Sequence, residues 1–72
     1  MEITFTDAGL AQMSNSQHNA LLAMIGRWKT MTALRVMKGG FDLPDGYLMF
    51  EQKFEKGDSI WGGIAPDGRV ST

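Results

Sequence analysis

The segment Ser16–Lys38, SQHNALLAMIGRWKTMTALRVMK, decides the fold of this chain. Large apolar side chains recur in it every three or four residues, at Leu21, Met24, Ile25, Trp28, Met31, Leu34 and Met37. This spacing lines one face of an α-helix. Residues 14–16 supply N-cap side chains before it, and residues 39–40 are glycines that can end a helix. We therefore expect one long helix, continuous or kinked, over residues 16–38.

Two features of this segment favour other arrangements. Gly26 lies in its middle, and the two threonines that follow are poor helix formers. A helix that ends near Lys29 would leave residues 32–37 to form a strand with Leu34 and Val36 facing inward. Two helices that meet near Gly26 or the first threonine would also fit. The apolar spacing keeps its phase to the end of the segment, so the single helix is the preferred prediction.

The sequence on either side of this segment predicts strands and turns. Residues 2–6 alternate polar and apolar side chains, which is typical of a half-buried strand, and a short helical turn over residues 8–13 can follow. Residues 41–46, rich in Asp, Pro and Gly, predict a connector. Residues 55–57 and 66–68 both end in glycine and suit three-residue hairpin loops. They predict a three-stranded antiparallel meander from residue 47 onwards.

The two hairpin loops also predict which side chains face inward. The first loop pairs Gln52 with Ile60 and Leu48 with Ile64, and the second pairs Ile64 with Val70. Both pairings place the same apolar side chains on one face, namely Leu48, Phe50, Ile60, Ile64 and Val70. Agreement between turn chemistry and apolar pattern supports this register.

These elements predict an α+β domain of two layers. One long helix, possibly kinked or broken, packs on a small antiparallel sheet made of the N-terminal strand and the meander. Seventy-two residues without cysteine form a single small domain, residues 1–72, with no disulfide to support its core. No signal-like N-terminus and no run of membrane-spanning length is present, so we expect a cytoplasmic protein that does not associate with membranes.

Residues that could carry catalysis are sparse. The single histidine, His18, falls in the first turn of the expected helix, and no nucleophile, base and orienting group converge on it. Without cysteine, a zinc site would need three carboxylates at suitable spacing, and none are so placed. We expect no enzymatic activity, no metal and no cofactor.

The outward face of the meander is the best candidate for function. It carries residue types that are enriched at protein interfaces. The candidates for protein binding are Tyr47, Met49, Glu51, Lys53, Trp61 and Arg69. If another strand or a second subunit covers this face, the same residues are core instead. The prediction is a small non-enzymatic protein-binding module of unknown partner, of the regulator or inhibitor type that phages and mobile elements encode, as anti-CRISPR proteins are.

Two alternatives belong to other classes. A nucleic-acid-binding protein would use the basic residues of the expected helix, Arg27, Lys29, Arg35 and Lys38, or the aromatic side chains Tyr47 and Trp61. A net charge of −1 makes this less probable, because dedicated binders have a denser basic patch. A homodimer would bury the aromatic face of the meander against its twin.

Overall fold

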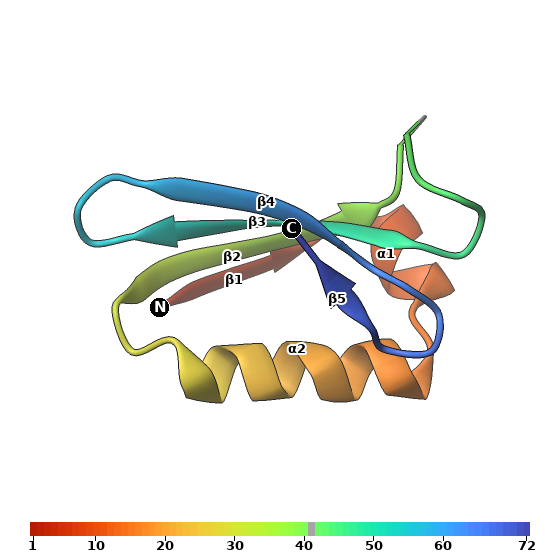
Figure 1. Cartoon of the computed structure of the whole chain (residues 1–72), viewed down its shortest axis with the longest axis horizontal. Coiled ribbons are helices and arrows are strands. Elements are labelled where there is room, and N and C mark those ends of the chain that lie inside the picture. The colour runs from red at the N-terminus through yellow and green to blue at the C-terminus, as the bar shows by residue number, and fades with distance from the viewer. Residues whose placement is uncertain (41) are drawn as a thin grey trace.

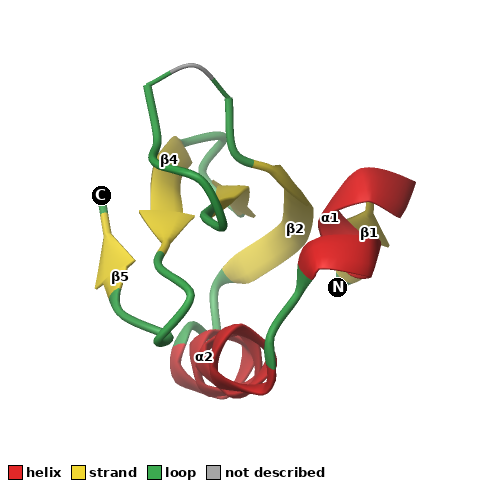
Figure 2. Ribbon diagram, turned by 90° about the vertical axis from the view of Figure 1, so that its right-hand side faces the viewer, coloured by secondary structure: helices red, strands yellow, loops and turns green. Residues whose placement is uncertain are grey.

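The computed structural model describes residues 1–40 and 42–72, which form one mixed five-stranded sheet and two helices (Figure 1). In chain order the elements are β1 (Glu2–Phe5), α1 (Asp7–Gln12), α2 (Asn15–Arg27), β2 (Met31–Lys38), β3 (Leu48–Phe54), β4 (Ser59–Ile64) and β5 (Val70–Ser71). The strands follow chain order across the sheet. β1 runs parallel to β2, and the other neighbours are antiparallel. Figure 2 shows α2 beneath the sheet, with β1 and β5 at its two edges.

The predicted long helix over residues 16–38 is wrong. α2 ends at Arg27, a turn follows, and Met31 begins β2. The second half of the segment is therefore an interior strand, paired with β1 on one side and β3 on the other. This matches the alternative in which Leu34 and Val36 face inward, since both are buried. The predicted antiparallel sheet is also corrected, because β1 joins it in parallel.

A β-bulge explains why β2 resembles a helix in sequence. Between Met31 and Ala33 the pairing with β3 shifts by one residue, and Thr32 is the extra one. The bulge places Met31 and Leu34, which are three residues apart, on the same buried face. Strict alternation then returns, so Met37 faces the opposite side. The apparent helical spacing thus joins side chains that lie on two different faces of a sheet.

The predicted pairing of the C-terminal half is confirmed. Leu48 pairs with Ile64, Gln52 pairs with Ile60, and Ile64 pairs with Val70 across the two predicted hairpins. Val70 was expected to face the core, yet it is 44% exposed. It lies in β5, a strand of two residues at the edge of the sheet, where little chain covers it.

The N-terminal region is confirmed in type and corrected in burial. The predicted strand is β1, but all four of its residues are exposed. The predicted helical turn is α1, and the Thr6 hydroxyl caps it by accepting a hydrogen bond from Gly9 N at 3.1 Å. Of the predicted connector, residues 42–46 form turns and bends, and Phe41 lies outside the described residues.

The core lies between α2 and the middle strands of the sheet. Its buried apolar side chains are Leu21, Met24, Met31, Leu34, Val36, Leu48, Phe50 and Ile64. α2 contributes only two of them, so the sheet supplies most of the core of this small domain. Over residues 1–40 and 42–72, neither helix is long and apolar enough to cross a membrane.

A buried glutamine ties α2 to the sheet. The Gln17 side chain is fully buried, and its Nε2 donates to Gly46 O at 2.8 Å and to Ile64 O at 3.0 Å. Its Oε1 accepts from Ser14 N at 2.9 Å, which completes a capping box at the start of α2. Nearby, Gln12 Nε2 donates to Tyr47 O at 2.8 Å. One amide therefore fixes the helix start against β3 and β4.

Replacing Gln17 with leucine should lower the free energy of unfolding by about 3 kcal/mol, because Ile64 O loses its donor away from water and Gly46 O and Ser14 N lose half-buried partners. Urea unfolding monitored by circular dichroism measures this loss. Gln12→Leu is the matched control; it removes a single, half-buried bond and should cost less than about 1 kcal/mol. Equal losses for the two variants would contradict the role given to Gln17.

Two glycines with nearly the same left-handed backbone should respond differently to alanine. Gly57 has a φ of 90° with open space where a Cβ would lie, and Gly68 has a φ of 91° with Ser16 O only 2.8 Å from that position. Gly57→Ala should cost about 1 kcal/mol from backbone strain alone. Gly68→Ala should cost about 1–3 kcal/mol more, because the turn must move off α2. Urea unfolding of both variants measures the difference, and equal costs would contradict the close approach at Gly68.

Candidate protein-binding surface

The sheet face that α2 does not cover is here called the outer face. Side chains point to alternate faces along each strand, so the outer face is the one opposite to the core residues of β2–β4. From these three strands it carries Ala33, Arg35, Met37, Met49, Glu51, Lys53, Ser59, Trp61 and Gly63. The register that turned Trp61 outward is confirmed, and its side chain is 47% exposed.

A row of directly paired residues crosses the outer face. Thr4 pairs with Arg35, Arg35 with Glu51, and Glu51 with Trp61. Arg35 Nη2 lies 3.0 Å from Glu51 Oε1, and Arg35 Cζ lies 5.5 Å from the centre of the Trp61 ring. One guanidinium therefore holds a carboxylate and stacks on an indole at the same time.

The carboxylate at the centre of this row is buried. Glu51 is only 8% exposed, and a carboxylate removed from water needs a charged partner. Arg35 supplies that partner while its own side chain stays half exposed. Glu51 therefore restrains the Arg35 guanidinium beside the Trp61 ring before any partner arrives. Fixing such a side chain in advance lowers the entropic cost of binding.

One end of the outer face is covered by the loop between β2 and β3. A Cβ at Gly63 would lie 3.3 Å from both Cδ atoms of Leu43, so this leucine packs on the glycine. Met49, paired with Gly63 and Met37, is half-buried there. The apolar end of the face is thus partly closed, and Trp61 marks where the open part begins.

The structure brings some of the sequence candidates together and separates others. Met49, Glu51, Lys53 and Trp61 share the outer face, although Glu51 is buried. Tyr47 precedes β3, is half-buried, and uses its carbonyl to accept from Gln12 and from Gly39 N. Arg69 lies in the exposed β4–β5 turn, where its N–H donates to Asp67 Oδ1 at 3.0 Å. It is not part of the patch around Trp61.

The basic residues proposed for nucleic-acid binding do not share one face. Arg27 ends α2, Lys29 lies in the following turn, and both sit at the start of β2. Arg35 is on the outer face and is engaged by Glu51. Lys38 is the last residue of β2, about 20 Å from the start of the strand at 3.3 Å per residue. The helix face that would have gathered them does not exist.

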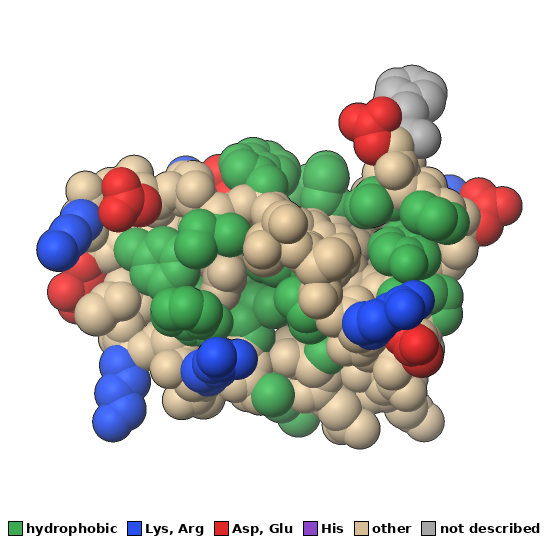
Figure 3. All heavy atoms as spheres, viewed as in Figure 1, with side chains coloured by type: hydrophobic (Ala, Val, Ile, Leu, Met, Phe, Trp, Pro, Cys, Tyr) green, Lys and Arg blue, Asp and Glu red, His purple; other side chains and the backbone are tan. Residues whose placement is uncertain are grey.

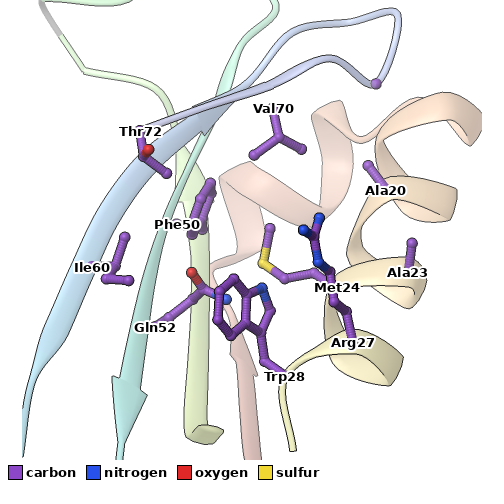
Figure 4. Close-up of a pocket in the computed structure, with 11 residues that line it drawn as sticks. Ala20, Ala23, Met24, Arg27, Trp28, Phe50, Gln52, Ile60, Val70 and Thr72 are labelled. Carbon is purple, nitrogen blue, oxygen red and sulfur yellow. The ribbon is translucent and has the colours of Figure 1, made fainter.

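Sequence reasoning missed an apolar groove on the other side of the sheet. A groove of about 570 Å³ lies between α2 and the strands β4 and β5 (Figures 3 and 4). Its apolar lining includes Met24, Trp28, Phe50, Ile60 and Val70. The indole of Trp28 meets the Phe54 ring edge-on at 5.7 Å and is 39% exposed. Only the break after α2, which the sequence pattern hid, places Trp28 there.

Metal-binding clusters are absent from the described part of the chain. Within residues 1–40 and 42–72, no group of three or more His, Cys, Asp or Glu side chains is placed to hold a metal ion. His18 is exposed on the first turns of α2. Comparisons with family models, with curated proteins and with solved structures find no match.

Replacing Arg35 alone should lower the free energy of unfolding more than replacing Arg35 and Glu51 together. Arg35→Leu leaves the Glu51 carboxylate buried without a partner and should cost about 1–3 kcal/mol. Glu51→Leu leaves a half-exposed arginine that water can solvate, and should cost less than about 1 kcal/mol. The double variant should be more stable than Arg35→Leu alone, measured as a double-mutant cycle by urea unfolding. Additive losses would contradict the coupling between the two side chains.

Proposed function

We propose that the chain is a small, non-enzymatic protein-binding module that binds its partner through the outer face around Trp61. The observation that carries this proposal is the Trp61 indole, half exposed and stacked on an arginine that a buried carboxylate anchors. Tryptophan and arginine are the residue types that most often dominate the binding energy of protein interfaces. A solvent-exposed tryptophan held in this way has no evident role in the core.

The surroundings of Trp61 also suit a protein partner. Arg35 covers one side of the indole, and the loop leucine Leu43 closes the apolar end of the outer face. Lys53 and Ser59 are exposed at the other end, so apolar and polar groups lie side by side. An apolar centre with a polar rim is the usual composition of such interfaces.

The type of module is proposed from size and chemistry. A single domain of this length, whose described residues hold no metal-binding cluster, suits a regulator or inhibitor that acts by occupying a partner's surface. Phages and mobile elements encode proteins of this kind, including anti-CRISPR proteins. A nucleic-acid partner is disfavoured, because phosphate binding needs convergent cations and those of this chain are dispersed.

Trp61→Ala should remove partner binding while the fold stays intact. A partner captured from the native host and purified would be titrated against each variant by calorimetry. We expect Trp61→Ala to weaken binding by at least about 30-fold, which corresponds to a hot-spot loss of about 2 kcal/mol. Trp28→Ala is the matched control, since Trp28 is exposed to a similar degree on the opposite side of the sheet and should leave the affinity unchanged.

Circular dichroism establishes first that both variants are folded. A partner whose affinity falls with Trp28→Ala and not with Trp61→Ala would overturn the outer face as the binding surface. Tight binding of generic DNA or RNA that weakens steeply with added salt would overturn the protein-binding proposal itself.

A further inference from the structure

We propose that two copies of this chain associate through β1, antiparallel about a two-fold axis at Thr4, so that their sheets join into one. β1 is an edge strand, and only one of its two sides is paired, by β2. This surface lies apart from Trp61, because β1 is at the opposite edge of the sheet from β4 and β5 (Figure 2). The inference therefore does not depend on the proposed function.

At this edge the backbone groups of β1 have no partner among residues 1–40 and 42–72. Thr6 N donates to Val36 O at 3.0 Å, so the N–H of Thr6 points toward β2. N–H and C=O groups alternate in direction along a strand, which turns those of Ile3 and Phe5 away from β2 and toward the free edge. These two residues therefore offer two donors and two acceptors to another strand.

The side chains of β1 match this backbone pattern. Ile3 and Phe5 pair with Leu34 and Val36, so they lie on the sheet face that carries the core. Yet they are 41% and 36% exposed, because α2 does not reach the edge. Leu22, 55% exposed, lies on the flank of α2 opposite to the groove-lining Ala20 and Ala23. Exposed apolar side chains thus come from both layers on the β1 side of the molecule.

One register satisfies backbone and side chains together. Opposed residues must face the same side of a sheet, and residues with outward backbone groups must meet each other. Placing Ile3 opposite Phe5 of a second copy meets both conditions twice, because the two-fold axis repeats the pair. It forms four interchain hydrogen bonds, with Thr4 opposite Thr4 on the axis. Glu2 then faces an uncharged residue, Thr6, so no like charges are opposed.

The edge also lacks most of the features that prevent such pairing, although β1 itself has only four residues. Edge strands are usually protected by lysine, proline, a bulge or short length. Residues 1–6 contain no lysine or proline, and the pairing of β1 with β2 has no bulge. β5, at the other edge, has only two residues and offers little to pair with. β1 is therefore both the open edge strand and the one that can pair with the same strand of a second copy.

A strand of four residues makes a modest interface, so the dimer should depend on concentration. Sedimentation equilibrium over a range of protein concentrations should show the mass rise from the 7.9 kDa of one chain toward twice that value. Ile3→Lys should keep the chain monomeric throughout, whereas Trp61→Ala should dimerise as the unmodified protein does. A monomer at every concentration, or a dimer insensitive to Ile3→Lys, would overturn the proposal.

Single cysteines test the register, since the chain has none of its own. Opposed residues that are not hydrogen-bonded to each other have Cα atoms about 4.5 Å apart, which is within disulfide range. Thr4→Cys should therefore form a covalent dimer on mild oxidation. Glu2→Cys, on the same strand and face, is the control; its two copies would lie about 13 Å apart and should stay monomeric.

The two cysteine variants are compared on non-reducing gels, after circular dichroism has established that each is folded. A disulfide at Glu2→Cys and not at Thr4→Cys would overturn the Thr4-centred pairing. Equal cross-linking of both would show unspecific oxidation and overturn it as well. Because Trp61 takes no part, failure here leaves binding through the outer face intact, and the reverse also holds.

Discussion

β2 is hydrogen-bonded to a strand on each side, and the rest of the structure depends on this position. An interior strand has no free edge, so β1 and β3 must both lie against it. Its buried face supplies Leu34 and Val36 to the core beneath which α2 packs. Its other face supplies Arg35 to the row that ends at Trp61. Core and candidate surface are thus two faces of one strand.

The small size of the domain explains why its surfaces remain open. α2 has thirteen residues and covers only the middle of a five-stranded sheet. One short helix therefore leaves three regions uncovered. They are the groove beside β4 and β5, the exposed apolar side chains of β1, and the outer face. A larger domain would bury these regions under further elements. Here they remain exposed, and Gln17 holds the helix in place through hydrogen bonds instead of additional apolar area.

The sequence predicted those parts of the candidate surface that depend on residues close together in the chain. The glycine-ended turns of residues 55–57 and 66–68 act over three residues, and they predicted the pairing of Leu48 with Ile64 and the exposure of Trp61 correctly. The sequence does not predict the Arg35–Glu51–Trp61 row, because the preferred helix over residues 16–38 contains Arg35. Only the alternative strand over residues 32–37 brings Arg35 beside Glu51.

The sequence by itself determined the hairpins and the capped start of α2, since each depends on residues adjacent in the chain. Only the tertiary structure decided that residues 31–38 form a strand, because their apolar spacing fits a helix as well as a bulged strand. Their backbone groups find partners on both sides in the sheet, and this pairing outweighs the local pattern. The parallel pairing of β1 was decided in the same way, because β1 pairs with residues that lie about thirty positions further along the chain.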